Sequence, residues 1–436
     1  MKKSRIRPLA ALGASLLLTG IAIAEHPVAE AQRHQRVANE AYQAGDFELF
    51  TQSMERAYEL NPASFATKYN LACGYAQMGR ADDALQLLQE LTLAQVDFGM
   101  ATDPDLESLR GLPRFQALVE ALAASISPIS NSERFLTIEQ LGIAAEGIAL
   151  DSKSGRLFVG SMRSGDIYVI DADKQFSKFA SVADHGVYSA IGLTVDHGRN
   201  VLWSVATSFF MAEGFSADDP RAAGLFGFDL DSGMLKHKHL VGESVNGLND
   251  VVVAPNGDVY VSGDVPHVLA AGSDELRPFT TSPSPFGSNG ITTDSTGETL
   301  FISSYPVGVA VVNIATGELH YLDAPPDRPL YGIDGLYWHD GDLIGIQNGI
   351  QPWRLLRMEL NDELTAVTDA HVIEFANRAL TATTGAIDGD RIHYVGQGPA
   401  PQNAPSQFPQ ALRPYLGKTM IMTAPLLPSE ETSQIP

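Results

Sequence analysis

The stretch AEGIALDSKSGRLFVGS (residues 145–161) holds two strand-like runs around a turn, and five later segments repeat this pattern. The later copies begin at Ala190, Leu248, Ser288, Ile333 and Thr383. Successive copies lie roughly 40–58 residues apart, with further short β-rich runs between them. Blades of a β-propeller require such spacing, so the sequence predicts an all-β six-bladed propeller over residues 133–424. A β-sandwich is the alternative, but sandwiches repeat less regularly.

Two further runs predict how the ring closes. RFLTIEQL begins at Arg134, before the first copy, and KTMIMTAPL begins at Lys418, after the last one. Pairing these two segments would complete the ring and remove its exposed strand edges. The polar residues 425–436 that follow are expected to be a disordered tail.

The preceding residues 25–126 have a helical period. Small and large apolar residues in segment 65–91 have the spacing of two interlocking antiparallel helices, and a weaker copy lies about 34 residues earlier. These segments resemble tetratricopeptide repeats. The expected fold class is therefore an α + β multidomain chain, with a small all-α helical-repeat domain preceding the propeller. Two repeats are few for independent stability, so we expect this domain to pack on the propeller.

The first 24 residues have the pattern of a secretory signal peptide. Four cationic residues precede an apolar run from Leu9 to Ala24, which is shorter than the ~20 residues that a membrane span needs. An uncleaved anchor is the alternative. We therefore expect a periplasmic or secreted protein with no membrane span after cleavage. The net charge of −23 disfavours nucleic acid and anionic membrane surfaces as partners.

Cys73 is the only cysteine, so it cannot form an internal disulfide. A small buried apolar side chain is the expected role, and a catalytic thiol is the alternative. The sequence contains no GxSxG nucleophile elbow and no phosphate-binding glycine loop. Chemistry in this chain must therefore come from other residues.

Polar residues recur at one position of the repeat. The first strand of each blade lines the central channel, so equivalent positions converge on the axis. The second residues of the six copies are Glu146, Ile191, Asn249, Asn289, Asp334 and Thr384. Carboxylate and amide oxygens favour a hard divalent cation, with Ca²⁺ preferred over Mg²⁺ because it accepts neutral oxygens in flexible geometry. The alternative is that Asn-Asp, Asn-Gly and Asp-Gly simply mark turns.

The ordered set EGI at Glu146, LND at Asn249, NGI at Asn289 and DGL at Asp334 resembles the senescence marker protein/gluconolactonase/regucalcin family and its paraoxonase and strictosidine synthase-like relatives. The resemblance covers about residues 140 to 400. It implies Ca²⁺ on the propeller axis, with Glu146, Asn289 and Asp334 as direct ligands and Asn249 as a ligand or substrate contact. It also implies hydrolysis of a lactone or related ester.

A carboxylate beside a bound cation can accept a proton from water. Asp334 is the first candidate for this catalytic role and Glu146 the second, although either residue can serve as a ligand alone. Ile191 occupies the position where paraoxonase-like members carry a channel histidine, so a histidine base is unsupported. No arginine shortly precedes Asn249, which weakens the case for sugar-acid lactones.

His185, Tyr188 and Tyr305 are candidate substrate contacts, with packing as the alternative role. Two functional hypotheses follow from the sequence. The first is an exported Ca²⁺-dependent hydrolase, gluconolactonase-like, that acts on a small-molecule lactone or ester. The second is a non-catalytic binding protein, in which the helical repeats and the propeller hold a protein partner and the cation is structural.

Overall fold

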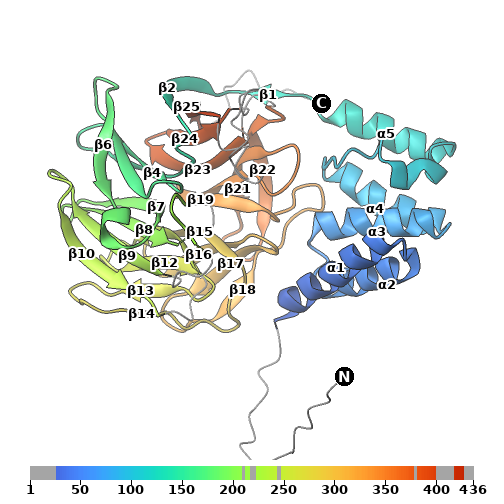
Figure 1. The fold of residues 1–436 in the computed structure, drawn as a ribbon, viewed down its shortest axis with the longest axis horizontal. Helices are drawn as coiled ribbons and strands as arrows, with labels where there is room; N and C mark the ends of the chain where they lie inside the picture. The colour runs from blue at the N-terminus through green and yellow to red at the C-terminus, as the bar shows by residue number, and fades with distance from the viewer. Residues whose placement is uncertain are drawn as a thin grey trace, which may run out of the picture.

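The computed structural model describes residues 26–208, 212–216, 222–242, 247–377, 381–398 and 417–426. Figure 1 shows a helical region on one side of a ring of six antiparallel sheets. The fold class therefore agrees with the sequence prediction: helices come first and a six-bladed β-propeller follows. The predicted signal peptide and residues 427–436 of the predicted tail lie outside the described residues. Among the described helices, none has the length and apolar character to cross a membrane.

The helical region contains two antiparallel helix pairs, a short 3-10 helix and a final helix. These elements are α1 (Pro27–Ala44), α2 (Phe47–Leu60), α3 (Phe65–Gln77), α4 (Ala81–Leu93), η1 (Pro104–Leu109) and α5 (Pro113–Ser125). Asp46 and Ser64 cap α2 and α3 by accepting a backbone N–H each. Gly45 and Gly79, about 34 residues apart, both adopt the left-handed conformation just after a helix. The predicted helices are confirmed, whereas their assignment as tetratricopeptide repeats stays a prediction.

Each blade is an antiparallel sheet whose first strand lies nearest the axis. Blades 1 and 2 contain β3 (Ala145–Asp151), β4 (Arg156–Ser161), β5 (Asp166–Ile170), β6 (Phe176–Ser181), then β7 (Ser189–Asp196), β8 (Val201–Thr207), β9 (Ala223–Asp229) and β10 (Leu235–Leu240). Blades 3 and 4 contain β11 (Leu248–Val253), β12 (Val259–Gly263), β13 (His267–Leu269), β14 (Leu276–Pro278), then β15 (Ser288–Thr293), β16 (Thr299–Ser304), β17 (Gly308–Asn313) and β18 (Leu319–Tyr321).

Blades 5 and 6 incorporate the strands that precede the first repeat. Blade 5 contains β19 (Ile333–His339), β20 (Asp342–Gln347), β21 (Arg354–Leu360), β22 (Val367–Phe375) and the added β1 (Ile129–Ser130). Blade 6 contains β23 (Thr381–Asp388), β24 (Arg391–Gln397), β25 (Lys418–Pro425) and β2 (Glu133–Leu141). The β2–β25 pairing confirms the predicted closure. The propeller runs slightly beyond its predicted end, because Pro425 belongs to β25 and Leu426 is fully buried.

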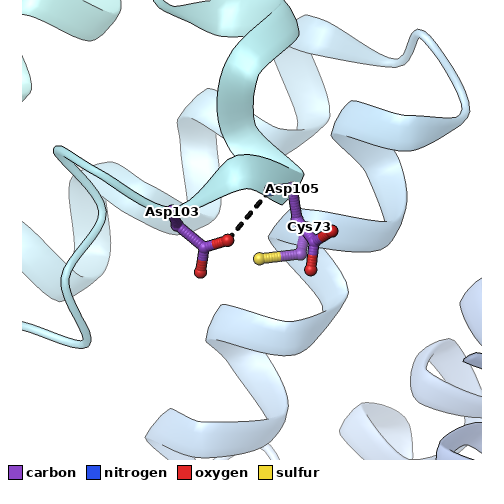
Figure 2. Close-up of side chains that lie close together, drawn as sticks. All are labelled: Cys73, Asp103 and Asp105. Carbon is purple, nitrogen blue, oxygen red and sulfur yellow. Dashed lines mark hydrogen bonds between the residues drawn. The ribbon is translucent and has the colours of Figure 1, made fainter.

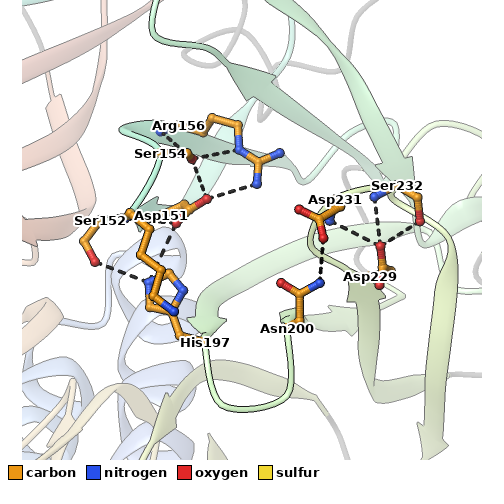
Figure 3. Close-up of polar contacts among 10 residues, drawn as sticks. Asp151, Ser152, Ser154, Arg156, His197, Asn200, Asp229, Asp231 and Ser232 are labelled. Atoms are coloured by element: carbon orange, nitrogen blue, oxygen red, sulfur yellow. Dashed lines mark hydrogen bonds and ion pairs between the residues drawn. The ribbon is translucent and has the colours of Figure 1, made fainter.

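Aspartate side chains hold one hairpin turn in each of blades 1 and 2 (Figure 3). Asp151, the last residue of β3, accepts hydrogen bonds from the Lys153 N–H and the Ser154 hydroxyl, and it pairs with Arg156 at 3.0 Å. Asp229, the last residue of β9, accepts two bonds from Ser232 in the same way. Such side-chain bonds replace backbone partners that a tight turn leaves unpaired.

The helical region packs on loops at the end of the propeller where the inner strands begin. Asn61 donates to Pro306 O at 2.9 Å, and the Asp97 N–H donates to Gln351 O at 2.8 Å. Arg354 is fully buried, and its guanidinium donates to Ala94 O and Gln95 O just after α4. A cation at a helix C-terminus is favourable because it interacts with the negative end of the helix dipole. The expected packing of the helices on the propeller is therefore present.

Candidate metal centre on the propeller axis

A β-bulge interrupts the innermost strand of every blade at the same point. At each bulge two residues of the inner strand face a single residue of the second strand. The first residues of the six bulges are Glu146, Ile191, Asn249, Asn289, Asp334 and Thr383. Bulges bend a strand and redirect its side chains. Six equivalent bulges thus present one ring of side chains at the same level of the channel, here called the axial ring.

The register corrects one position of the predicted ring. In blade 6, Ala382 pairs with Gly396 and Gly385 pairs with Tyr394, so Thr383 is the first bulge residue and Thr384 the second. Thr384 Oγ1 donates to Glu146 O of the neighbouring blade instead. The sequence alignment on Gly385 placed this blade one residue out of register, because the bulge is not visible in the sequence.

The second bulge residue lies where neighbouring inner strands approach each other. In four blades this residue is glycine, and a Cβ on Gly290 would lie 2.5 Å from Asp334 O. A side chain at Gly290 would therefore collide with the next strand, which explains the glycine there. Blade 3 has Asp250 at this position, and its carboxylate is buried beside Gly192. Asp250 is a site residue that the repeat pattern does not predict, because in the sequence it is only the last residue of LND.

Asp334 is oriented by a chain of hydrogen bonds. Asn348, which follows β20, donates from Nδ2 to Asp334 Oδ2 at 2.5 Å and to Ala382 O at 2.9 Å. The Tyr305 hydroxyl donates to Asn348 Oδ1 at 3.0 Å. Tyr305 therefore acts behind the axial ring by holding Asn348 in place. Asn348 is not predicted from the repeat pattern, and its position at the end of the second strand is its only sequence signal.

Three oxygens of the axial ring are buried and without hydrogen-bond partners. They are Asn289 Oδ1, Asp334 Oδ1 and Thr383 Oγ1, within the part of the chain that the structure describes. Unpaired buried polar atoms are uncommon and call for an explanation. A hard divalent cation would satisfy all three, because it is bound by carboxylate and neutral oxygens. The residues present thus fit the predicted cation.

The raised pKa values of the carboxyl groups around the axial ring also favour a bound cation. Burial raises the pKa of Asp334 to about 6, and the amides of Asn348 and Asn289 oppose this effect. Burial also raises the pKa of Asp250 to about 7. Glu146 has a pKa well above its usual value, because of burial and the neighbouring Asp334 and Asp250. A bound cation would favour the ionised forms of these carboxyl groups.

The carboxylates alone do not form a closed cage. Among the described residues, the oxygens of Glu146, Asp250 and Asp334 do not all lie within 4.8 Å of one another. Asn249 lies in the axial ring between them in chain order and is partly exposed to the channel. A cation at this level would therefore use carboxylate and amide oxygens together. This mixed donor set suits Ca²⁺ better than a metal that prefers nitrogen or sulfur.

Asp250 and Tyr337 line the next section of the channel. The Tyr337 hydroxyl accepts a hydrogen bond from the Gly385 N–H at 2.5 Å, and its pKa is well above the usual value because of burial and the nearby Asp250. Both residues line a cavity of about 240 Å³ between the inner strands. These two polar groups lie in a cavity whose remaining lining is largely apolar.

The three candidate substrate contacts occupy different places. The His185 ring lies against Phe226 and Phe228 of β9, with centroids 6.4 and 6.2 Å apart, which corresponds to a packing position. Tyr188 directly precedes β7 and is partly buried, close in sequence to Ile191 of the axial ring. Tyr305 contacts Asn348 as described above. Tyr305 is thus hydrogen-bonded to Asn348, the residue that holds Asp334.

Cys73 lies in the helical region beside Asp103 and Asp105 (Figure 2). Burial raises the pKa of its thiol above the usual range. The neighbouring carboxylates already accept hydrogen bonds, Asp103 from Tyr69 and Asp105 from Tyr42. A buried neutral thiol with this surrounding has the expected structural role.

Comparison with known proteins gives structural matches alone. No family model and no curated protein matches this chain. A gluconolactonase from Xanthomonas campestris is 15% identical, with 64% of this chain and 85% of that chain covered and a TM-score of 0.44. A calcium-binding protein, regucalcin, from Agrobacterium tumefaciens is 16% identical, with 65% and 91% covered and a TM-score of 0.43. An oxidoreductase (glucose dehydrogenase) from Thermus thermophilus is 14% identical, with 68% and 99% covered and a TM-score of 0.46. Similarities this low identify no activity for this chain.

Proposed function

We propose that this chain is an exported, Ca²⁺-dependent hydrolase of a lactone or small ester that acts at the axial ring. One observation carries the proposal: Asn289 Oδ1, Asp334 Oδ1 and Thr383 Oγ1 are buried without partners at the level where six inner strands converge. A stable fold normally pairs such atoms. A divalent cation bound in the axial ring would supply the partners that these atoms lack.

Residues of the axial ring and its surroundings would each have a separate role in hydrolysis. A bound cation supplies polarisation of a carbonyl oxygen and a lowered pKa of water. Asn348 fixes one oxygen of Asp334 and leaves the other unpaired. Asp334 is thus the first candidate to orient water and accept its proton, and Glu146 is the second. Ile191 contributes no polar group and leaves an apolar section of the ring for a substrate's carbon skeleton.

The decisive experiment assays the purified protein against a panel of lactones and aryl esters, with and without a chelator. Asp334→Ala should abolish chelator-sensitive hydrolysis, and Asp362→Ala, at an exposed turn, should retain it. Calorimetric titration with Ca²⁺ runs in parallel. Hydrolysis that survives the chelator, or that Asp334→Ala leaves unchanged, contradicts the mechanism.

A non-catalytic role for the same site is the second candidate. The helical region packs on the end of the propeller where the axial ring lies, which favours a surface that holds a protein partner. Ca²⁺ binding without hydrolysis of any compound on the panel would favour this role. Absence of Ca²⁺ binding would exclude both roles of the axial ring.

A further inference from the structure

A second group of metal-binding side chains lies at the opposite end of the inner strands. His339 ends β19, Asp340 lies in the following turn, and Asp390 lies in the β23–β24 turn of the neighbouring blade. His339 Nε2 is 3.5 Å from Asp340 Oδ2 and 3.9 Å from Asp390 Oδ1. The three ligand atoms lie within 4.8 Å of one another. Blades 5 and 6 therefore share one His/Asp/Asp cluster.

The imidazole distinguishes this cluster from an ordinary acidic surface. The His339 side chain is 10% exposed, whereas the Asp340 and Asp390 side chains are 77% and 79% exposed. Among the residues that the structure describes, the His339 ring has no hydrogen-bond partner, and its Nε2 faces both carboxylates. At the Cys73 cluster, by contrast, the carboxylates are occupied by tyrosine hydroxyls.

The separations match those of a tetrahedral metal site. Zn²⁺ lies about 2.0–2.2 Å from histidine nitrogen and carboxylate oxygen, so two ligands of a tetrahedral ion are about 3.3–3.5 Å apart. The observed 3.5 and 3.9 Å need only a small movement of two exposed aspartate side chains. We propose that His339, Asp340 and Asp390 form a site for Zn²⁺ or a similar transition-metal ion, with one position left to water.

This site is separate from the axial ring in place and in chemistry. Asp334 and His339 lie at opposite ends of β19, five residues or about 17 Å apart along an extended strand. The axial ring offers oxygen alone and favours Ca²⁺, whereas an imidazole ligand favours Zn²⁺. The two ions should therefore bind independently.

A metal ion at this site would stabilise the propeller, because the site joins two blades. Blade 6 is the closure blade, because β2 and β25 join within it. A metal held by Asp340 of blade 5 and Asp390 of blade 6 links the closure blade to its neighbour. Since a ligand that binds only the folded state stabilises it, Zn²⁺ should raise the melting temperature of the protein.

The test uses the full chain, stripped of metal by a chelator and then saturated with Ca²⁺. Zn²⁺ is titrated in competition with a chromogenic chelator, and Co²⁺ is titrated in parallel because its visible spectrum reports coordination. We expect one Zn²⁺ per chain that raises the melting temperature by several degrees. Asp390→Asn, at an exposed position, and His339→Ala should each weaken Zn²⁺ binding at least tenfold.

Two controls separate this site from others. His371 pairs with Glu359 at 2.9 Å on the surface, so His371→Ala removes a histidine beside a carboxylate but should leave Zn²⁺ affinity unchanged. Asp334→Asn should weaken Ca²⁺ binding and leave Zn²⁺ binding intact. Equal Zn²⁺ affinity in the wild type and in both site variants, or no binding below about 100 μM, overturns the proposal. If the axial ring binds no Ca²⁺, these Zn²⁺ measurements still test the His339 site.

Discussion

Asn348 donates one hydrogen bond to Asp334 Oδ2 at 2.5 Å and another to Ala382 O at 2.9 Å. Asp334 belongs to blade 5 and Ala382 to blade 6, so one amide group fixes the axial carboxylate relative to the next blade. Asp334 Oδ1 stays unpaired. The carboxylate is thus held with one oxygen occupied and the other available.

Replacing Asn348 should weaken cation binding without removing a predicted ligand. Asn348→Leu keeps the approximate size but loses both donors, and we expect a 10–100-fold loss of Ca²⁺ affinity, as is typical when a ligand's supporting residue is removed. Tyr305→Phe removes the donor to Asn348 alone and should cost less. Titration calorimetry measures both. An affinity of Asn348→Leu equal to that of the wild type would show that Asp334 needs no support.

The two adjacent threonines of β23 should behave differently. Thr383→Val removes an unpaired ring oxygen, so Ca²⁺ affinity should fall several-fold while the melting temperature of the metal-free protein changes little. Thr384→Val removes the donor to Glu146 O and should lower that melting temperature instead. Calorimetric titration and thermal denaturation distinguish the two effects. The opposite result would place Thr384 in the ring.

Ca²⁺ affinity should rise with pH. Asp334 and Asp250 have pKa values raised to about 6 and about 7, and the pKa of Glu146 is raised as well. The cation requires the ionised carboxylates, so it competes with protons below these values. We expect the affinity to increase between pH 5 and pH 8, with proton release detectable in weakly buffered solution. A flat profile across this range would argue against binding at these carboxyl groups.

The metal-free protein should show the reverse dependence of stability. A carboxyl group whose pKa is higher when folded binds more protons in the folded state, so it lowers the free energy of unfolding as pH rises. The effect begins near pH 4 and is complete above the folded values of about 6 and 7. In chelator at pH 8, Asp334→Asn should therefore melt at a higher temperature than the wild type. At pH 5 the difference should shrink. A lower melting temperature at pH 8 would contradict this account.

Arg354 should control how firmly the helical region is attached. Its buried guanidinium donates to Ala94 O and Gln95 O and lies over the Phe375 ring at 5.1 Å. Arg354→Ala leaves these carbonyls unpaired and opens a cavity, at a cost of about 2–4 kcal/mol. Arg354→Met refills the space and should cost less. Limited proteolysis between α5 and β2 reports detachment, and resistance equal to that of the wild type would contradict it.

The repeat in the sequence determined the number of blades, the closing strands and most of the axial ring. Propeller blades are built from local contacts, since each hairpin pairs residues that are near in sequence. The alternation of apolar and turn residues therefore predicts them. The pairing of β2 with β25 follows from the same pattern, because these two segments remain unpaired once six blades are counted, whereas the residue register comes from the structure.

Only the tertiary structure decided which residues support the site. A bulge shifts the register by one residue, so it selects Thr383 rather than Thr384 without any mark in the sequence. Asn348, Asp250 and His339 acquire their neighbours from adjacent strands and blades, at distances that periodicity does not encode. Sequence patterns specify which face of a strand a residue occupies, whereas hydrogen bonds between strands specify which side chains meet.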